Sequence, residues 1–598
     1  QCEIKNQRQT SIKELDFPFE YRPGQKKLVS DVYRTIMRQK LLFMQAPTGV
    51  GKTISTIFPA VKAVGEELAD RIFYLTAKTI TATVAKETFA LLEKNGYRAK
   101  TIQITAKEKL CPCDEMECNP VTCPYAKGHF DRVNDAVFDL LHRCEMIERD
   151  DILSQADRYT VCPFELCLDT ASWCDNIICD YNYVFDPNVY LKRFFQEGIK
   201  GDYIFLIDEA HNMVERSRQM YSAQIYKEDF LTVKRIMKEH SRSIEKALEK
   251  CNKILLGMKR ECENYTVYDT FGNMVFSFMR LMTLLDEFLQ KANEFPGKKD
   301  VMDFYFELRN FLNIYDLVDE HYVMYSELEA DGRFMLKLFC VDPSLNIQKR
   351  LDKGKSAVFF SATFLPVNYY KSLLSTKKDN YAIYADSTFD SKKRLLAMAT
   401  DVSTRYTRRS RSEYERIAGY INAVVTQKTG NYMVFFPSYK MMNDVADIYC
   451  EKYADETELM LQKNNMSEAE REEFLDRFSE ESDRTLVAFG IMGGIFGEGI
   501  DLKNDRLIGA IVVGTGLPQI SNERTILKDY YDAENGCGFD YAFRYPGINK
   551  VLQAAGRVIR TTEDTGVILL LDERFWQREY DLLYPREWSD RKPRNIAN

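Results

Sequence analysis

One short glycine-containing segment near the start of the chain constrains its fold more than any other. The segment reads Ala46-Pro47-Thr48-Gly49-Val50-Gly51-Lys52-Thr53, follows the apolar run Leu41–Met44 and precedes a stretch with helical periodicity. A strand, a glycine loop and a helix in this order are typical of the phosphate-binding loop of a parallel α/β sheet. The sequence therefore predicts an α/β domain with a nucleotide site at the end of this strand.

The pattern gives the residues of this loop different roles. We expect Lys52 to reach the β and γ phosphate oxygens of ATP and the Thr53 hydroxyl to bind Mg²⁺. Glycines let backbone N–H groups approach phosphates. The backbone expected to surround the phosphates belongs to Ala46, Thr48, Gly49 and Gly51. The general pattern begins with Gly and this one begins with Ala46, so an incidental glycine-rich turn is the alternative.

An acidic motif follows the apolar strand Tyr203–Ile207. It reads Asp208-Glu209-Ala210-His211. A phosphate loop places Mg²⁺ where an acidic residue at a neighbouring strand end can hold it through water, and Asp208 suits that role. Glu209 suits the base that orients the attacking water. By itself the motif is also compatible with an exposed acidic loop, and the upstream phosphate loop favours the catalytic interpretation.

A second α/β unit is predicted from about residue 380 onward, with a further set of nucleotide-facing residues. Gln553–Arg560 contains Gln553 and two arginines, Arg557 and Arg560, whose spacing places them on one helix face. Across a cleft from the phosphate loop, both arginines are expected to contact the γ-phosphate as arginine fingers. A solvated surface helix is the alternative.

A glycine-rich turn, Met492–Asp501, lies in the same unit. Its backbone can approach a phosphate chain or a ribose, so Gly499 and Asp501 are candidate nucleotide contacts. Ordinary turn chemistry is the alternative.

Between the two units the composition changes twice. Residues 222–340 are poor in Gly and Pro and carry Leu, Lys, Glu and Met at helical spacing, which predicts a mostly helical insertion. Upstream of it, nine of the fifteen cysteines lie between Cys111 and Cys179. Without a secretory signal, such a cluster indicates a metal or iron–sulfur site before it indicates disulfides.

Composition excludes several classes of protein. The 598 residues are 45 % hydrophobic and 29 % charged, which is typical of a globular chain of several domains. The net charge of −8 excludes a polybasic coat protein but not a nucleic-acid enzyme, because a groove needs only local positive potential. No apolar run reaches membrane-spanning length. The chain begins at Gln1 rather than Met, and we expect it to be trimmed upstream.

In order along the chain, these motifs resemble those of superfamily 2 helicases and, more narrowly, the XPD/DinG family of iron–sulfur DNA helicases, especially its bacterial members. The resemblance spans roughly residues 20–575. It rests on Tyr21–Gln25 as the adenine-reading Q element with Gln25 as its glutamine, Tyr74–Thr79 as motif Ia, Ile178–Tyr183 as the N-Y-N-Y stretch with Asp180 for its first Asn, Phe360–Thr363 as motif III, Phe435–Ser438 as motif IV, Gly497–Asp501 as motif V and Gln553–Arg560 as motif VI.

The resemblance implies an α/β fold class with two RecA-like parallel-sheet motor domains. A small Cys-rich iron–sulfur domain and a mostly helical arch domain are inserted in the first motor domain. The expected bounds are 1–107, 168–221 and 346–378 for the first motor domain, 108–167 for the iron–sulfur domain, 222–345 for the arch and 379–598 for the second motor domain.

The resemblance also implies four cysteine ligands for a [4Fe–4S] cluster. The matching positions are Cys111, Cys118, Cys123 and Cys162. Four thiolates suit such a cluster, and they equally suit tetrahedral Zn²⁺. Cys113 and Cys167 lie close by as substitutes, and unrelated thiols are the remaining alternative. An insertion of this size has little core of its own, so metal binding is expected to supply its folding energy.

Contacts to single-stranded DNA are expected along both motor domains. The candidate backbone contacts are Thr79, Asn182, Ser438 and Arg405. Tyr181 is a candidate for stacking on a base, and the alternative is that this aromatic run packs in the core. The run Arg405–Arg411 is the densest positive patch of the second unit, and it either lines the strand path or is solvated.

Together these observations predict an ATP-dependent DNA helicase that uses ATP, Mg²⁺ and a [4Fe–4S] cluster. Its 5′→3′ polarity, its action on forked or tailed duplexes and its role in repair or replication maintenance follow from the resemblance alone. We expect a monomer without membrane association, in the bacterial cytoplasm at the nucleoid. The alternatives are a DNA-stimulated translocase or redox-sensing module without unwinding, the motor part of a helicase–nuclease, and, least favoured, an RNA helicase.

Overall fold

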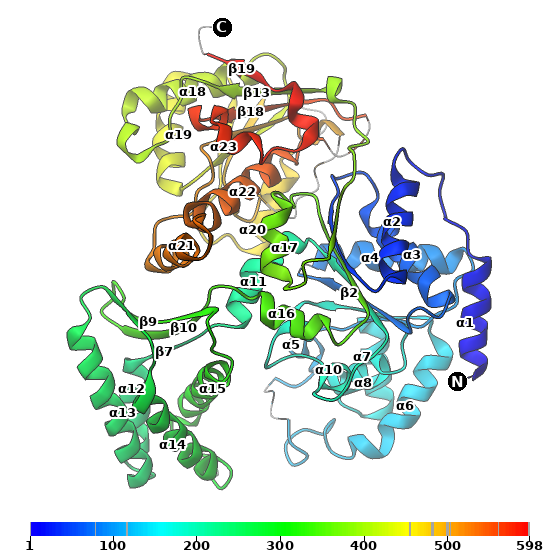
Figure 1. The fold of residues 1–598 in the computed structure, drawn as a ribbon, viewed down its shortest axis with the longest axis vertical. Coiled ribbons are helices and arrows are strands. Elements are labelled where there is room, and N and C mark those ends of the chain that lie inside the picture. Colours follow the sequence, from blue (N-terminus) through cyan, green and yellow to red (C-terminus); the bar gives the residue numbers. More distant parts are fainter. Residues whose placement is uncertain are drawn as a thin grey trace.

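The computed structural model describes residues 2–77, 79–114, 116, 118–292, 294–453, 456–479, 483–497, 502, 504–559, 561 and 563–595. Three sheets organise the described chain: one parallel sheet of eight strands, one parallel sheet of seven and one antiparallel sheet of four. Figure 1 shows the two parallel sheets in separate lobes, with the antiparallel sheet and its helices in a third.

The first α/β domain is built on the eight-stranded sheet. Its strands, in spatial order, are β12 (Tyr381–Tyr384), β1 (Leu41–Gln45), β11 (Ser356–Ser361), β6 (Tyr203–Asp208), β2 (Arg71–Thr76), β5 (Asn176–Asp180), β3 (Thr101–Gln103) and β4 (Met146–Ile147). Its helices are α1 (Cys2–Glu14), α2 (Gln25–Met37), α3 (Lys52–Gly65), α4 (Thr79–Lys94), α9 (Asn182–Phe185), α10 (Lys192–Phe195), α11 (Met213–Met220), α16 (Ser344–Leu351) and α17 (Val367–Leu374), with a short 3₁₀ turn η1 (Ala210–Asn212).

Both faces of this sheet are covered. Along β1, Phe43 packs in one hydrophobic core while Leu42 and Met44 pack in the other, and all three are buried. Side chains alternate between the two faces of a strand, so a strand buried on both faces is apolar throughout. This explains why the predicted strands are near-continuous apolar runs.

One predicted boundary needs correction. Residues from 379 onward were assigned to the second domain, yet β12 pairs in parallel with β1 of the first sheet. The extra strand covers the outer edge of β1, so the first domain extends through Tyr384.

The cysteine-rich insertion is helical and rests on the first domain. It contains α5 (Lys107–Leu110), α6 (His129–Arg143), α7 (Arg149–Tyr159) and α8 (Pro163–Ala171). Leu110, Leu140 and Leu166 belong to the same hydrophobic cluster as Phe43 of β1. The helices of this segment therefore share the core of the domain instead of forming one of their own.

The second insertion carries four long helices, as expected, and a sheet that was not expected. The helices are α12 (Lys227–Met237), α13 (Arg242–Glu261), α14 (Gly272–Leu289) and α15 (Lys298–Tyr315). The antiparallel strands, in spatial order, are β7 (Ala223–Tyr226), β10 (Phe334–Cys340), β9 (Tyr322–Leu328) and β8 (Tyr265–Tyr268). An Asp-Gly pair, Asp331-Gly332, lies between β9 and β10 and was the available hairpin signal.

The second α/β domain is built on the seven-stranded sheet. Its strands, in spatial order, are β15 (Glu458–Leu461), β16 (Leu486–Ile491), β14 (Asn431–Phe436), β17 (Gly509–Val513), β18 (Gly566–Leu571), β13 (Arg394–Ala399) and β19 (Lys592–Arg594). Its helices and helical turns are η2 (Ser391–Lys393), η3 (Tyr406–Arg408), α18 (Arg411–Val425), α19 (Tyr439–Tyr453), α20 (Glu468–Asp476), η4 (Asn504–Arg506), α21 (Asn522–Asn535), the π-helical turn η5 (Asp540–Arg544), α22 (Tyr545–Ala555), η6 (Glu573–Trp576), α23 (Arg578–Asp581) and η7 (Arg586–Asp590).

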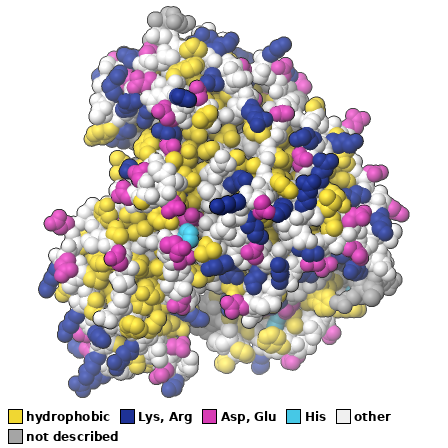
Figure 2. Space-filling view, viewed as in Figure 1, with side chains coloured by type: hydrophobic (Ala, Val, Ile, Leu, Met, Phe, Trp, Pro, Cys, Tyr) yellow, Lys and Arg dark blue, Asp and Glu magenta, His cyan; other side chains and the backbone are white. Residues whose placement is uncertain are grey.

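Charges of both signs are mixed on the surface. Figure 2 shows Lys and Arg interspersed with Asp and Glu over all three lobes on the face in view. Among the described helices, none combines the length and the apolar character needed to cross a bilayer.

Candidate nucleotide cleft and cysteine pocket

The glycine loop has the backbone that the sequence predicted. Gly49 and Gly51 adopt left-handed φ values of 84° and 74°, which favour glycine. Gly51 precedes α3, and no side chain caps the first turn of this helix. Backbone N–H groups at an uncapped helix N-terminus attract anions, so the end of β1 is a ready phosphate site.

The two predicted carboxylates stand at the same sheet edge. β11 is the only strand between β1 and β6, and parallel strands bring their carboxyl ends together, so Asp208 at the end of β6 faces the loop after β1. The Lys52 ammonium lies 3.8 Å from Oε1 of Glu209. The structure therefore brings Lys52, Asp208 and Glu209 together as predicted.

Asp208 is held in an environment that suits a metal ion. It is buried; its Oδ2 accepts a 2.6 Å hydrogen bond from the Tyr74 hydroxyl and its Oδ1 a 2.8 Å bond from the Glu209 N–H. Burial and the neighbouring Glu209 carboxylate raise the pKa of Asp208 to about 6. The Tyr74 hydroxyl also bonds Thr53, so both predicted Mg²⁺ ligands share one neighbour. A buried carboxylate beside a threonine hydroxyl fits Mg²⁺, which takes hard oxygen ligands.

A hydrogen-bond chain links these carboxylates to the second domain. Gln553 Nε2 on α22 lies 2.6 Å from His211 Nε2, and His211 Nδ1 lies 2.7 Å from Ser361 Oγ at the end of β11. The Ser361 hydroxyl in turn lies 3.4 Å from Glu209 Oε2. A neutral imidazole with its proton on Nδ1 satisfies every donor and acceptor in this chain. Gln553 is therefore connected to Glu209 through His211 and Ser361.

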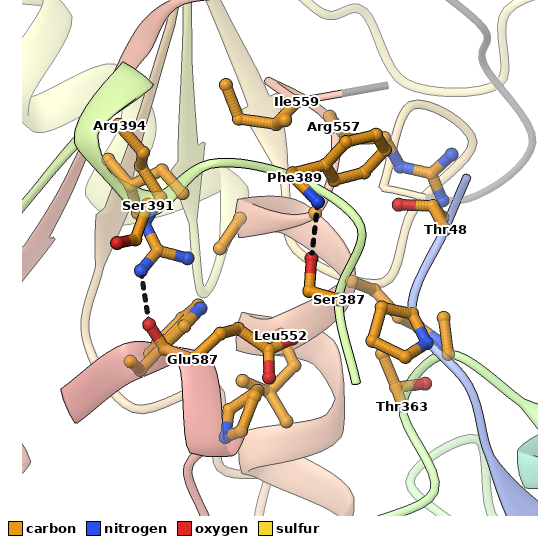
Figure 3. Close-up of a pocket in the computed structure, with 18 of the residues that line it drawn as sticks. Thr48, Thr363, Ser387, Phe389, Ser391, Arg394, Leu552, Arg557, Ile559 and Glu587 are labelled. Carbon is orange, nitrogen blue, oxygen red and sulfur yellow. Dashed lines mark hydrogen bonds between the residues drawn. The ribbon is translucent and has the colours of Figure 1, made fainter. Parts of the chain in front are cut away.

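The cavity between the two domains has a volume of about 330 Å³. Thr48 and Glu209 line it from the first domain, and Gln553 and Arg557 from the second. Nη2 of Arg557 donates a 2.9 Å hydrogen bond to the Gly497 carbonyl. Figure 3 shows Arg557 on the same side of the cavity as Thr48 of the phosphate loop. Arg560, Gly499 and Asp501, which were also predicted here, lie outside the described residues.

Gln25 contacts the phosphate loop itself. Its amide donates to the Val50 carbonyl at 3.3 Å and to Ser55 Oγ at 3.2 Å, and its Oε1 accepts from the Arg22 N–H at 3.0 Å. Gln25 is buried and does not line the cavity between the domains. Its predicted contact with adenine stays a prediction, while its contact with the loop is a finding.

Sequence reasoning missed Phe389. This residue lies in the segment that connects the two domains and lines the cavity (Figure 3). A methyl group built on Gly49 would stand 2.1 Å from Cζ of Phe389, so the ring tip rests directly against the loop glycine. An isolated aromatic residue in a linker carries no pattern that points to this contact.

A second pocket gathers the cysteines. It is lined by Cys111, Cys118, Cys123 and Cys162, the four predicted ligands, and also by Cys113. Among the described residues, the one set with three candidate ligand atoms within 4.8 Å of one another is Asp319, Glu320 and His321. The thiols therefore surround a space instead of converging on a point. Thiols arranged around a space in this way fit a multi-iron cluster, whose iron and sulfide atoms would lie between the thiolates.

Cys167, the other candidate substitute, lies elsewhere. It is buried on α8 and its Sγ is 3.9 Å from the Gln103 carbonyl. It does not line the cysteine pocket.

The predicted DNA contacts have mixed outcomes. Tyr181 takes the alternative of core packing: the residue is fully buried and its hydroxyl donates to the Asp208 carbonyl. Asn182 accepts a 3.2 Å hydrogen bond from Arg216, Ser438 Oγ accepts from the Met441 N–H at 3.3 Å, and Arg405 lies 3.8 Å from Glu573. The Thr79 side chain lies outside the described residues. Next to Arg405, Tyr406 is 84 % exposed, which the sequence alone did not indicate.

Comparisons with known proteins agree with this arrangement. Residues 92–230 match the DEAD_2 domain family and residues 421–591 match a helicase C-terminal domain family. The XPD ATP-dependent DNA helicase of Sulfolobus acidocaldarius is 25 % identical over 93 % of this chain and 96 % of its own length. A probable ATP-dependent helicase of Methanocaldococcus jannaschii, MJ0942, is 21 % identical over 94 % and 92 %.

A solved structure of an XPD helicase superposes with a TM-score of 0.63, covering 96 % of this chain and 99 % of that one at 18 % identity. This likeness confirms the predicted fold of two RecA-like parallel-sheet domains. The chain belongs to the XPD/Rad3-like helicase family.

Proposed function

We propose that the chain is an ATP-dependent DNA helicase that moves 5′→3′ along single-stranded DNA and unwinds duplexes. The observation that carries this proposal is the cleft: Thr48 of the phosphate loop and Glu209 line one wall, and Gln553 and Arg557 line the other. A nucleotide bound there contacts both domains. The family relatives named as ATP-dependent DNA helicases support DNA as the substrate.

The residues of the cleft have distinct tasks in ATP hydrolysis. Lys52 and the loop N–H groups hold the phosphates, while Asp208 and Thr53 are placed to hold Mg²⁺, which neutralises developing charge. Glu209 accepts a proton from water as that water attacks the γ-phosphorus and the bond to the β–γ bridging oxygen breaks. Arg557 supplies positive charge from the opposite domain.

Coupling to DNA is proposed to run through the hydrogen-bond chain. Glu209 changes partners during hydrolysis, and Ser361 and His211 connect it to Gln553 on α22. A change at the γ-phosphate therefore reaches the second domain over three hydrogen bonds. Opening and closing of the cleft then moves the protein along the single-stranded DNA.

The proposed DNA path combines Asn182 on the first domain with Ser438 and Arg405 on the second. Tyr406 replaces Tyr181 as the stacking residue, because an exposed ring beside arginines suits a base. The Arg409 guanidinium lies 5.5 Å from the Tyr406 ring centre, which keeps positive charge at this position. These contacts predict DNA binding that weakens as salt rises.

We further propose a [4Fe–4S] cluster in the cysteine pocket, serving as a wedge that splits the duplex. Thiolates around one Zn²⁺ lie about 3.8 Å apart, because zinc–sulfur bonds of about 2.3 Å are arranged tetrahedrally. The described thiols do not gather in threes within 4.8 Å. A cluster core standing between them accounts for this spacing better than a single ion. The same proposal includes a role in DNA repair, membership of the bacterial DinG-like branch of the family and action at the nucleoid.

The test is strand displacement by protein purified without oxygen. We expect ATP-dependent unwinding of a 5′-tailed duplex, little unwinding of a 3′-tailed one, and ATPase stimulated more by DNA than by RNA. Lys52→Ala should abolish hydrolysis and leave most DNA binding intact. DNA-stimulated ATPase without displacement would show a translocase instead, and hydrolysis retained by Lys52→Ala would overturn the cleft assignment.

A further inference from the structure

The cysteine pocket holds five thiols, while a [4Fe–4S] cluster takes four protein ligands. The additional thiol is Cys113, two residues after Cys111. Its thiol lies beside those of Cys123 and Cys111 in the pocket. Cys113 therefore stands among the ligands proposed for the cluster, and its role follows from that position. This inference rests on the cluster proposed above.

The local backbone explains why both thiols reach one space. Leu110 is buried and ends α5, and the Cys111 N–H donates a 2.8 Å hydrogen bond to the Lys107 carbonyl. Cys111 is then extended, with φ −67° and ψ 122°, as expected for a residue before proline. Two residues of extended chain span at most about 7 Å. The Cys111 and Cys113 thiols are therefore held close to the same pocket.

The remaining nearby cysteines do not share this position. Cys167 points to the Gln103 carbonyl at 3.9 Å, and Cys144 Sγ lies 3.8 Å from Asp151 Oδ1. Neither lines the pocket. The additional thiol of the pocket is thus Cys113, which lies two residues from Cys111 along the chain and also neighbours Cys123.

We propose that Cys113 is an exchange ligand of the cluster that binds the iron of Cys111 when Cys111 releases it. In the exchange the Cys113 thiol gives up its proton, its sulfur bonds the iron, and the Cys111 sulfur leaves and takes up a proton. No electrons are gained or lost, so no oxidant is needed. The exchange lets the chain keep its cluster when Cys111 is modified.

Serine variants purified without oxygen test this through iron and sulfide content. We expect the unmodified protein, Cys111→Ser and Cys113→Ser each to contain about four irons per chain. The double variant should lose them, as Cys118→Ser should. Cys144→Ser is the matched control outside the pocket and should keep them. Iron loss in Cys111→Ser overturns the exchange role, because Cys113 is present and should have prevented it.

Alkylation of the loaded proteins, read by mass spectrometry, identifies which sulfur is bound. In the unmodified protein iodoacetamide should label Cys113 and spare Cys111. In iron-loaded Cys111→Ser it should spare Cys113. If Cys113 is labelled there while the iron stays, the serine oxygen is the ligand and the inference fails. An unmodified protein that contains no iron overturns the proposed cluster together with this inference, whereas the other adverse results overturn the inference alone.

Discussion

Asp208 shows how a single residue is prepared for its partner. Its carboxyl group is buried, and burial together with the neighbouring Glu209 carboxylate raises its pKa. Tyr74 and the Glu209 N–H satisfy one hydrogen bond on each oxygen. Each oxygen can accept a further partner, and the positive charge of Lys52 acts on the same carboxylate.

Gln553 provides the first prediction at this scale. Gln553→Ala removes the donor to His211, and a buried polar atom without its partner costs about 1–3 kcal/mol. Because this bond joins the two domains, we expect DNA-stimulated kcat to fall roughly 5- to 150-fold while nucleotide Kd changes little. Steady-state ATPase and nucleotide titration measure the two effects. Gln519→Ala, at an exposed position, is the matched control, and equal losses in both variants would contradict the coupling role.

Phe389 provides the second prediction at the residue scale. Its ring rests against Gly49, where a triphosphate would approach, so binding has to displace a partly buried aromatic side chain. Removing the ring in Phe389→Ala is expected to tighten ADP binding by about 1–2 kcal/mol, roughly 5- to 30-fold in Kd. Calorimetric titration checks this. Weaker binding in the variant would show instead that the ring contacts the nucleotide.

At the scale of elements, a buried charged cluster fixes the loop after β13 to the end of β18. The Asp572 carboxylate accepts hydrogen bonds from the Thr404 N–H at 2.9 Å and hydroxyl at 2.6 Å, and from Arg574 at 2.8 Å. Burial by itself raises the pKa of Asp572, but Arg574 and Thr404 outweigh it, so the net pKa is lowered. This cluster holds the base of the Arg405–Arg411 segment.

The lowered pKa of Asp572 predicts that the free energy of unfolding depends on pH. Because its folded pKa lies below the unfolded value of about 3.9, its stabilising contribution is present above that value and is lost as pH falls through the folded pKa. Asp572→Asn leaves Arg574 without its partner and should cost about 3–5 kcal/mol at pH 7. Thermal melts should show the difference in Tm narrowing as pH is lowered below 4. A difference that is constant with pH would exclude the carboxylate as its source.

Across the whole molecule, α21 is where the second domain meets the helical insertion. Lys337 of β10 pairs with Glu523, and Asn522 contacts Glu327 of β9 at 2.9 Å. On the same helix, Ile526 and Leu527 join the large hydrophobic cluster of the first domain. Figure 1 shows α21 facing β9 and β10 across this junction. Because α21 contacts both the first domain and the insertion, movement between the two α/β domains has to change these contacts.

The prediction at this scale concerns motion at that junction. A nonhydrolysable ATP analogue should close the cleft and change amide hydrogen exchange in α21 and in β9, although neither lines the cavity. Exchange measured by mass spectrometry, with and without analogue, tests this. Lys52→Ala serves as the control and should show no change. Altered exchange confined to the cleft would mean that the insertion does not follow the nucleotide.

Sequence patterns predicted the parts of this molecule that are set by local chemistry. A glycine loop follows one apolar strand, and an acidic pair follows another. Because parallel strands end at the same edge of the sheet, both motifs are predicted to lie at that edge. Lys52, Asp208 and Glu209 needed nothing else to be placed together. The long helices α12–α15 were equally accessible, since their apolar spacing is repeated over many residues.

Other positions depended on contacts between residues far apart in the chain. Tyr181 is aromatic whether it stacks on a base or packs in a core, and only the surrounding fold buries it. β12 joined the first sheet because the edge of β1 was free to pair, which no property of residues 381–384 encodes. The short strands of the insertion similarly depend on partners elsewhere in the sequence.

The sequence by itself determined the class of fold and the nucleotide-binding edge, because each depends on residue type and spacing within a short segment. The four cysteine ligands stay a prediction that the family resemblance implies. Only the tertiary structure decided that Gln25 serves the loop, that Phe389 rests on Gly49 and that Cys113, not Cys167, enters the pocket. These outcomes depend on which surfaces meet when the chain is packed. Packing is a property of the whole molecule, so local patterns do not encode it.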